Sequence, residues 1–159
     1  ALAGDETAVL YTESHHNNFQ CWDDGNKFEV SVIGENLEVA VTRILIFDFA
    51  GREIFSHEVK FHHLTAAGSP LGNDDLEYVV SQIWSELSPK RTSDLLPWAD
   101  EKSFYDMYDE VPALSQAAYE AARELDAPYV CYQTYYEGST CIWFNQSNQT
   151  VETLLRYSA

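Results

Sequence analysis

The chain has 159 residues, 14% of them aromatic, and its formal net charge at pH 7 is −17. Nine Lys and Arg against 26 Asp and Glu leave little positive charge to neutralise phosphates, so direct binding to nucleic acid or to an anionic membrane is not expected. The length suits one domain, residues 1–159, with a sizeable core, and no apolar run reaches the roughly 18 residues that a transmembrane helix needs.

Residues 1–20 read as a polar N-terminal lead-in. The chain begins Ala1-Leu2-Ala3, which fits the A-x-A pattern left at a signal-peptidase site and favours a periplasmic or secreted protein over a cytoplasmic one. The chain has three Cys residues, an odd number, so at most one intramolecular disulfide can form.

The next stretch, residues 28–63, predicts a three-stranded antiparallel meander. Phe28–Gly34 and Leu37–Phe49 are rich in β-branched and aromatic residues, which favour strands. Asp48-Phe49-Ala50-Gly51 has the Asp and Gly that a type I turn favours at its first and fourth positions. Ile44–Phe47 is apolar at both its odd and its even positions, which predicts a strand covered on both faces.

The third predicted strand contains three of the five histidines, in "FSHEVKFHHLT". Strand alternation would place His57 and His63 on the core-facing side and His62 on the opposite side. Three imidazoles arranged in this way cannot bind one metal ion. The remaining pair, His15-His16, lacks the spacing of a metal-binding motif, so the sequence predicts no metal site and no cofactor.

A first helix is predicted to follow, with Asn73 or Asp74 as its N-cap and Glu77 completing a capping box with Asp74. Ser88-Pro89 should end it. Its apolar residues recur with helical spacing and form one stripe: Leu76, Val79, Val80, Ile83, Trp84 and Leu87.

Residues 90–110 are irregular, aromatic and acidic, with a short helix expected from Asp100 to Tyr108. Long loops are often functional, and Tyr and Trp dominate interface hot spots. The sequence therefore predicts that a partner binds here, through cation–π contacts and carboxylate pairing. The predicted partner-binding residues are Trp98, Asp100, Glu101, Phe104, Tyr105, Asp106, Tyr108, Asp109 and Glu110.

A second helix is expected to start near Pro112, a residue suited to a first helical turn. Its predicted buried stripe consists of small and aliphatic residues: Leu114, Ala118, Ala121, Ala122 and Leu125.

The C-terminal part predicts a hairpin and a last strand, Val151–Tyr157. Glu137-Gly138 is the expected hairpin tip. That tip sets Thr134 opposite Cys141 and puts Cys131 and Cys141 on opposite faces of the hairpin. A disulfide would therefore join Cys21 to Cys131 or to Cys141.

The predicted elements come in the order strands, helices, strands, with no βαβ alternation. This order predicts an α+β fold. We expect an antiparallel sheet of five to six strands, made from the meander, the C-terminal hairpin and the last strand. Two main helices would pack on one face of this sheet.

No motif in the sequence specifies a reaction. The first hypothesis is a non-enzymatic acidic module that binds and masks a basic partner protein, in the manner of bacterial antidote or immunity proteins, of inhibitors, or of chaperones. The alternative is an exported small-molecule-binding protein or small hydrolase with a pocket between the sheet and residues 90–110. His57, Glu58 or Cys141 would then be its working groups.

A third hypothesis is a nucleic-acid mimic that carries carboxylates spaced like phosphates. Such a mimic needs a linear array of acids along one helix face. Glu120 and Glu124 supply only a fragment of such an array.

Overall fold

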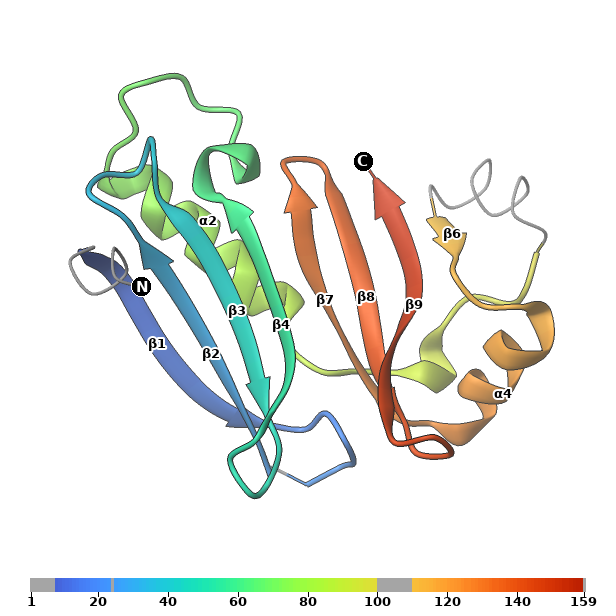
Figure 1. The fold of residues 1–159 in the computed structure, drawn as a ribbon. Helices are drawn as coiled ribbons and strands as arrows, with labels where there is room; N and C mark the ends of the chain where they lie inside the picture. The colour runs from blue at the N-terminus through green and yellow to red at the C-terminus, as the bar shows by residue number, and fades with distance from the viewer. Residues whose placement is uncertain (1–7, 24, 100–109, 159) are drawn as a thin grey trace.

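The computed structural model describes residues 8–23, 25–99 and 110–158, and these form two antiparallel sheets and two α-helices. The first sheet has the order β1-β2-β3-β4 and the second β5-β7-β8-β9-β6. The α+β prediction is confirmed, with the strands divided between two sheets (Figure 1). The strands are β1 (Val9–Asn17), β2 (Asn26–Ile33), β3 (Val41–Phe47), β4 (Glu53–Lys60), β5 (Lys90–Arg91), β6 (Glu110–Pro112), β7 (Pro128–Tyr135), β8 (Gly138–Asn145) and β9 (Thr150–Ser158).

The predicted meander corresponds to β2, β3 and β4, which pair in sequence order. Within the predicted polar lead-in, the structure contains β1, an additional strand that pairs with β2. The lead-in prediction missed β1 because most of its residues are exposed, so the strand lacks an apolar repeat.

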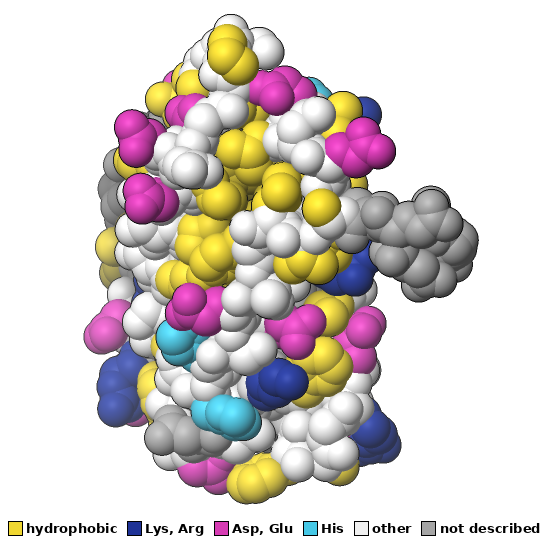
Figure 2. Space-filling view, turned by 90° about the vertical axis from the view of Figure 1, so that its left-hand side faces the viewer, with side chains coloured by type: hydrophobic (Ala, Val, Ile, Leu, Met, Phe, Trp, Pro, Cys, Tyr) yellow, Lys and Arg dark blue, Asp and Glu magenta, His cyan; other side chains and the backbone are white. Residues whose placement is uncertain are grey.

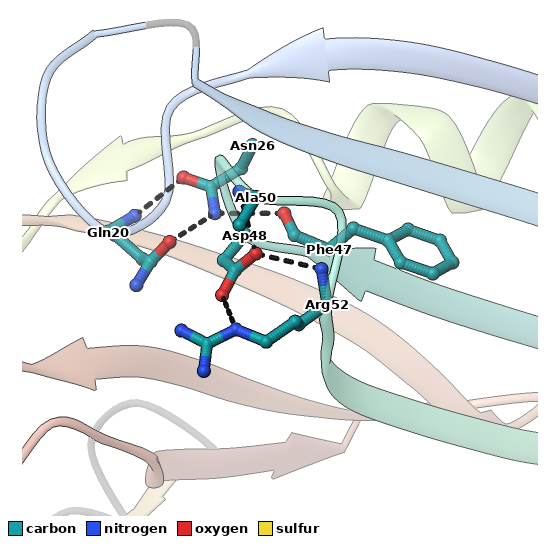
Figure 3. Close-up of polar contacts among 6 residues, drawn as sticks. All are labelled: Gln20, Asn26, Phe47, Asp48, Ala50 and Arg52. Atoms are coloured by element: carbon teal, nitrogen blue, oxygen red, sulfur yellow. Dashed lines mark hydrogen bonds and ion pairs between the residues drawn. The ribbon is translucent and has the colours of Figure 1, made fainter.

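The turn between β3 and β4 has the predicted form, with Gly51 at φ 85°. The Asp48 carboxylate accepts hydrogen bonds from the backbone N–H groups of Ala50 (2.9 Å) and Arg52 (2.8 Å), and from Arg52 Nε (2.9 Å) (Figure 3). The bond from the Arg52 N–H is the main reason why the pKa of Asp48 lies below its ordinary value.

A buried amide secures the same end of the sheet. Asn26 is 2% exposed, and its Nδ2 donates to Gln20 Oε1 (2.9 Å) and to the Phe47 carbonyl (3.1 Å) (Figure 3). Its Oδ1 accepts from the Gln20 N–H (3.0 Å). The side chain thus satisfies its polar atoms inside the protein and connects β2 to the preceding loop and to β3.

Two expectations for this sheet were wrong. Ile44 and Ile46 are buried, but Leu45 and Phe47 are only half-buried, so β3 is fully covered on one face and not on both. The third strand ends at Lys60, and Phe61–Leu64 form a 3-10 turn (η1).

The histidine prediction changes with that turn. Strand alternation holds only while the chain stays extended, so His63 does not share a strand face with His57. The rings of His62 and His63 lie together, with centroids 4.3 Å apart.

The first helix, α2 (Asn73–Glu86), buries the predicted stripe, with Val79, Ile83 and Leu87 in the core. Its N-cap is Gly72, not Asn73 or Asp74. Asp75, not Glu77, completes the cap, because its carboxylate accepts from the Gly72 N–H (2.7 Å).

The second helix, α4 (Gln116–Leu125), begins after Ser115, whose hydroxyl accepts from the Ala118 N–H (3.2 Å). Pro112 ends β6 instead. The predicted buried stripe was largely wrong, because Tyr119 and Ala122 are the fully buried residues of α4. The large ring of Tyr119 fills the core on this side, and the helix turns three of the predicted residues outward: Ala118, Ala121 and Leu125.

The second sheet is covered on both faces, so its central strand β8 is buried along almost its whole length. On one face, Val130 and Ile142 join the core that the first sheet and α2 share. On the other face, Trp143 and the two sheet cysteines pack with Tyr119 of α4.

The disulfide prediction was wrong. Cys131 and Cys141 are directly opposed in the β7–β8 ladder and form the disulfide, while Cys21 is a free, exposed thiol. The hairpin turns at Tyr136-Glu137, one residue before the predicted tip, and β7 contains an irregularity after Gln133. Together these changes alter the pairing register by an odd number of residues, which brings both cysteines to the same face.

Candidate functional site

A cleft of about 340 Å³ lies between α2 and the β7–β8 hairpin. We call it the tyrosine–glutamate cleft, because its lining includes three phenol rings and two carboxylates and no Lys, Arg or His side chain. The lining residues are Leu64, Tyr78, Gln82, Glu86, Gln133, Tyr136, Glu137, Gly138, Ser139 and Tyr157.

One wall of the cleft comes from α2. Tyr78, Gln82 and Glu86 follow each other at intervals of four residues, so they lie along one side of the helix. This row is adjacent to the apolar stripe that anchors α2 in the core. Tyr78 is 59% exposed, which leaves its ring available for contact with a partner.

The opposite wall is the tip of the hairpin. Tyr136 and Glu137 form the turn, and Gly138 and Ser139 begin β8. An added Cβ at Gly138 would lie 2.0 Å from Tyr135 Cε1, so a larger residue here would displace the exposed Tyr135 ring.

The Glu86 carboxylate lies at the half-buried end of the cleft, where its Oε1 accepts a hydrogen bond from the Ser139 hydroxyl (2.7 Å). Burial raises the pKa of Glu86, and the Ser139 bond and the charge of Lys90 partly oppose that rise. Ser139 is 4% exposed, which favours a role in orienting Glu86 over attack on a substrate.

Two other titratable groups adjoin Glu86. Lys90 Nζ donates to the carbonyls of Glu86 (3.0 Å) and Ser88 (3.2 Å), so it satisfies the C-terminal end of α2, and burial lowers its pKa. Burial also raises the pKa of Tyr157. Glu86 thus lies in a desolvated polar cluster, an arrangement that is common at functional sites.

The predicted partner-binding segment is described only in part. Trp98 is half-buried and its ring packs edge-on against Tyr119, with centroids 5.5 Å apart. Glu110 lies half-buried in β6, and burial raises its pKa. The other predicted residues lie outside the described residues, so their role stays a prediction: Asp100, Glu101, Phe104, Tyr105, Asp106, Tyr108 and Asp109.

The structure does not assemble the three groups that the hydrolase hypothesis named. Cys141 is bonded to Cys131, and Glu58 pairs with Arg43 (2.7 Å). The ring of His57 lies against Tyr132, with centroids 4.5 Å apart, and burial lowers its pKa. These three groups therefore form no catalytic pair that would support the small-hydrolase alternative.

A second polar cluster lies where β1 meets α2. The Tyr11 hydroxyl accepts from Trp84 Nε1 (2.8 Å) and donates to Glu13 (3.3 Å), and Glu13 is also paired with His15 Nε2. The His15 ring meets Trp84 edge-on at 4.2 Å. Among the described residues, no group of three or more His, Cys, Asp or Glu side chains is arranged to hold a metal ion.

Figure 2 shows the β1 side of the molecule, where hydrophobic side chains run down the middle of the face. Acidic side chains are scattered around this strip and are interspersed with Lys and Arg. The negative charge is thus dispersed on this face, in contrast to the tyrosine–glutamate cleft.

Sequence reasoning missed the cleft because its two walls come from distant parts of the chain, as the separation of 53 positions between Glu86 and Ser139 illustrates. A signal was present on each wall. Tyr78 interrupts the polar side of the first helix, and Tyr135-Tyr136-Glu137 places two rings and a carboxylate at a hairpin tip. Neither signal indicates that the two segments face each other.

Comparison with known proteins adds no functional information, because no family model, curated protein or solved structure matches the chain. Within the described ranges, no helix is long and apolar enough to cross a membrane.

Proposed function

We propose that this chain is a non-enzymatic interaction module that binds and masks a basic partner protein. In this proposal a Lys or Arg side chain of the partner enters the tyrosine–glutamate cleft. The observation that carries the proposal is the composition of the lining, in which three phenol rings and two carboxylates occur without a basic side chain.

The electrostatics of Glu86 support a cationic occupant. Burial disfavours its ionised form, as the raised pKa indicates, and the nearby Lys90 ammonium is held by carbonyl groups at the helix end. A guanidinium or ammonium entering the cleft would pair with the carboxylate and favour its ionised form. The phenol rings of Tyr78 and Tyr136 would add cation–π contacts.

The net charge of −17 would act at longer range. Such a charge steers a basic protein toward the chain and speeds encounter at low salt. It also argues against direct nucleic-acid binding, because two polyanions repel each other. An inhibitor, an antidote or immunity protein, and a chaperone for a basic protein would all work in this way.

The proposal can be tested with a defined cationic probe, the capped peptide acetyl-Gly-Arg-Gly-Arg-Gly-amide, titrated into the isotope-labelled protein. We expect chemical-shift changes at Tyr78, Glu86 and Tyr136, and weaker binding at high salt. Glu86→Gln and Tyr136→Ala should each weaken binding by about tenfold, which is about 1.4 kcal/mol.

Glu35→Gln is the matched control, because it removes one negative charge from an exposed residue between β2 and β3 that does not line the cleft. We expect its affinity for the probe to equal that of the wild type. Equal losses in the Glu35→Gln and Glu86→Gln variants would show that only net charge matters and would contradict the role of the cleft.

A further inference from the structure

The wall of the tyrosine–glutamate cleft includes a hydrogen-bond acceptor without a donor. Gln133 lines the cleft, and its Oε1 is buried with no hydrogen-bond partner among the described residues. The other atom of the amide fixes its orientation, because Nε2 donates to the Tyr136 carbonyl (3.4 Å), a group that can only accept. A buried acceptor without a donor is unfavourable, since it has given up its bonds to water. A ligand that brings a donor to Gln133 would remove that penalty.

Gln133 and Glu86 both adjoin Ser139, although they come from different elements. Gln133 is directly opposite Ser139 in the β7–β8 ladder, so their side chains lie on the same face with Cβ atoms about 5 Å apart. The Ser139 hydroxyl in turn donates to Glu86 Oε1 (2.7 Å). Among the described residues, no side chain donates to the second carboxylate oxygen, Oε2. One ligand group with several donors could therefore meet acceptors from both walls of the cleft.

Exposed phenol rings accompany these acceptors in the lining. Tyr78 of α2 is 59% exposed, and Tyr136 of the hairpin turn is 45% exposed. A guanidinium can stack its flat face on an aromatic ring while its N–H groups donate in the plane of the group. Stacking and hydrogen bonding therefore do not compete for the same part of the ligand.

A guanidinium matches this arrangement better than an ammonium does. Its five donors are spread over a rigid plane, so it can donate to Glu86 and to Gln133 at the same time, whereas an ammonium carries its three donors on one atom. A guanidinium is also more weakly hydrated than an ammonium. This difference favours arginine in the cleft, because Glu86 is half-buried and a cation that pairs with it has to lose water.

We propose that the tyrosine–glutamate cleft selects arginine over lysine, a specificity that rests on the proposed function of the cleft. The guanidinium donates to the Glu86 carboxylate and to Gln133 Oε1, and its plane stacks on an exposed phenol ring. Glu86 supplies the attraction for a cation, and Gln133 determines which cation is preferred. The anchor residue of the basic partner is therefore an arginine.

The test compares the capped peptide acetyl-Gly-Arg-Gly-Arg-Gly-amide with two matched peptides, in which both Arg residues are replaced by Lys or by citrulline. Citrulline keeps the planar shape of arginine but carries a neutral urea group. Dissociation constants are measured by titration of the isotope-labelled protein at one low salt concentration. The side-chain amide signals of Gln133 provide a local readout.

We expect the Arg peptide to bind about tenfold more tightly than the Lys peptide, because only the guanidinium reaches both acceptors and stacks. The citrulline peptide should bind more weakly than the Arg peptide, since it cannot form an ion pair with Glu86. Gln133→Met keeps the length of the side chain and removes the acceptor. It should weaken the Arg peptide and leave the Lys peptide nearly unchanged, so the ratio of the two affinities falls.

Gln116→Met is the matched control, because it makes the same substitution at an exposed residue of α4 that does not line the cleft. We expect its ratio of Arg to Lys affinity to equal that of the wild type. A fall in this ratio is a readout that a general loss of structure would not produce, because such a loss weakens both peptides.

Equal affinities for the Arg and Lys peptides would overturn the selectivity and leave the proposed function intact, since both cations would then enter the cleft. An affinity ratio that Gln133→Met does not change would overturn the role of Gln133. Absence of binding by both cationic peptides would contradict the proposed function, and the selectivity with it. The peptide comparison requires no change in the protein, so it remains decisive even where Gln133→Met disturbs the hairpin.

Discussion

The Cys131–Cys141 disulfide leads to a prediction that tests the hairpin register directly. We consider the double variant Cys131→Ala and Cys141→Ala in a Cys21→Ala background, so that no thiol exchange can occur. The bridge joins residues with a sequence separation of 10. In the chain-entropy treatment, closing a loop of that size removes about 9 cal/mol/K from the unfolded chain, or about 3 kcal/mol at 25 °C.

We therefore expect the double variant to lose about 3 kcal/mol of unfolding free energy. For a chain of this length, that loss corresponds to a fall in Tm of about 6 to 12 °C. Chemical denaturation followed by Trp fluorescence measures the first quantity and calorimetry the second. Cys21→Ala alone should unfold like the wild type, because the Cys21 thiol is exposed and unbridged.

The reasoning would be refuted by an unchanged Tm in the double variant. It would also be refuted by peptide mapping of the oxidised wild type that finds Cys21 in a bridge. Alkylation of the native protein that labels Cys21, and neither Cys131 nor Cys141, supports the register.

Three further predictions concern charged residues. Burial raises the pKa of Glu86 in the folded state. The contribution of Glu86 to stability is therefore greatest below its unfolded pKa and declines as pH rises through its folded pKa. Between these two pKa values, the unfolding free energy of the Glu86→Gln variant should fall less with rising pH than that of the wild type. Asp48→Asn should lower Tm at pH 7, and the difference from the wild type should disappear as pH falls through the folded pKa of Asp48, since that pKa is lowered and the stabilisation needs the ionised carboxylate. Reversing Asp106 and Asp109 to Lys should slow association with a basic partner, measured by stopped flow at low salt, far more than it speeds dissociation; an unchanged association rate would contradict steering through that segment.

Local features of the fold were readable from the sequence. The apolar stripe of α2, the meander and the turn at Gly51 follow from periodicity and turn chemistry, which act over a few residues. The buried face of α4 was not predictable in this way. Its alanines fit either side of a helix, and the packing of Tyr119 decides which side is buried.

The candidate sites depended on contacts between distant segments. Glu86 and Ser139 are 53 positions apart, yet their hydrogen bond defines one end of the tyrosine–glutamate cleft. The contact between β4 and β9 likewise joins strands that are distant in the chain. No local pattern encodes either approach, because each results from the packing of complete sheets and helices.

The sequence by itself determined the fold class, the apolar faces of the main strands and of α2, and the strong negative charge, since these depend on residue type and short-range spacing. Only the tertiary structure decided the hairpin register, the pairing of Cys131 with Cys141 and the position of the tyrosine–glutamate cleft. The physical reason is that a single irregularity in β7 changes which side chains share a face, and that a cleft exists only where two elements already packed on the core leave space between them.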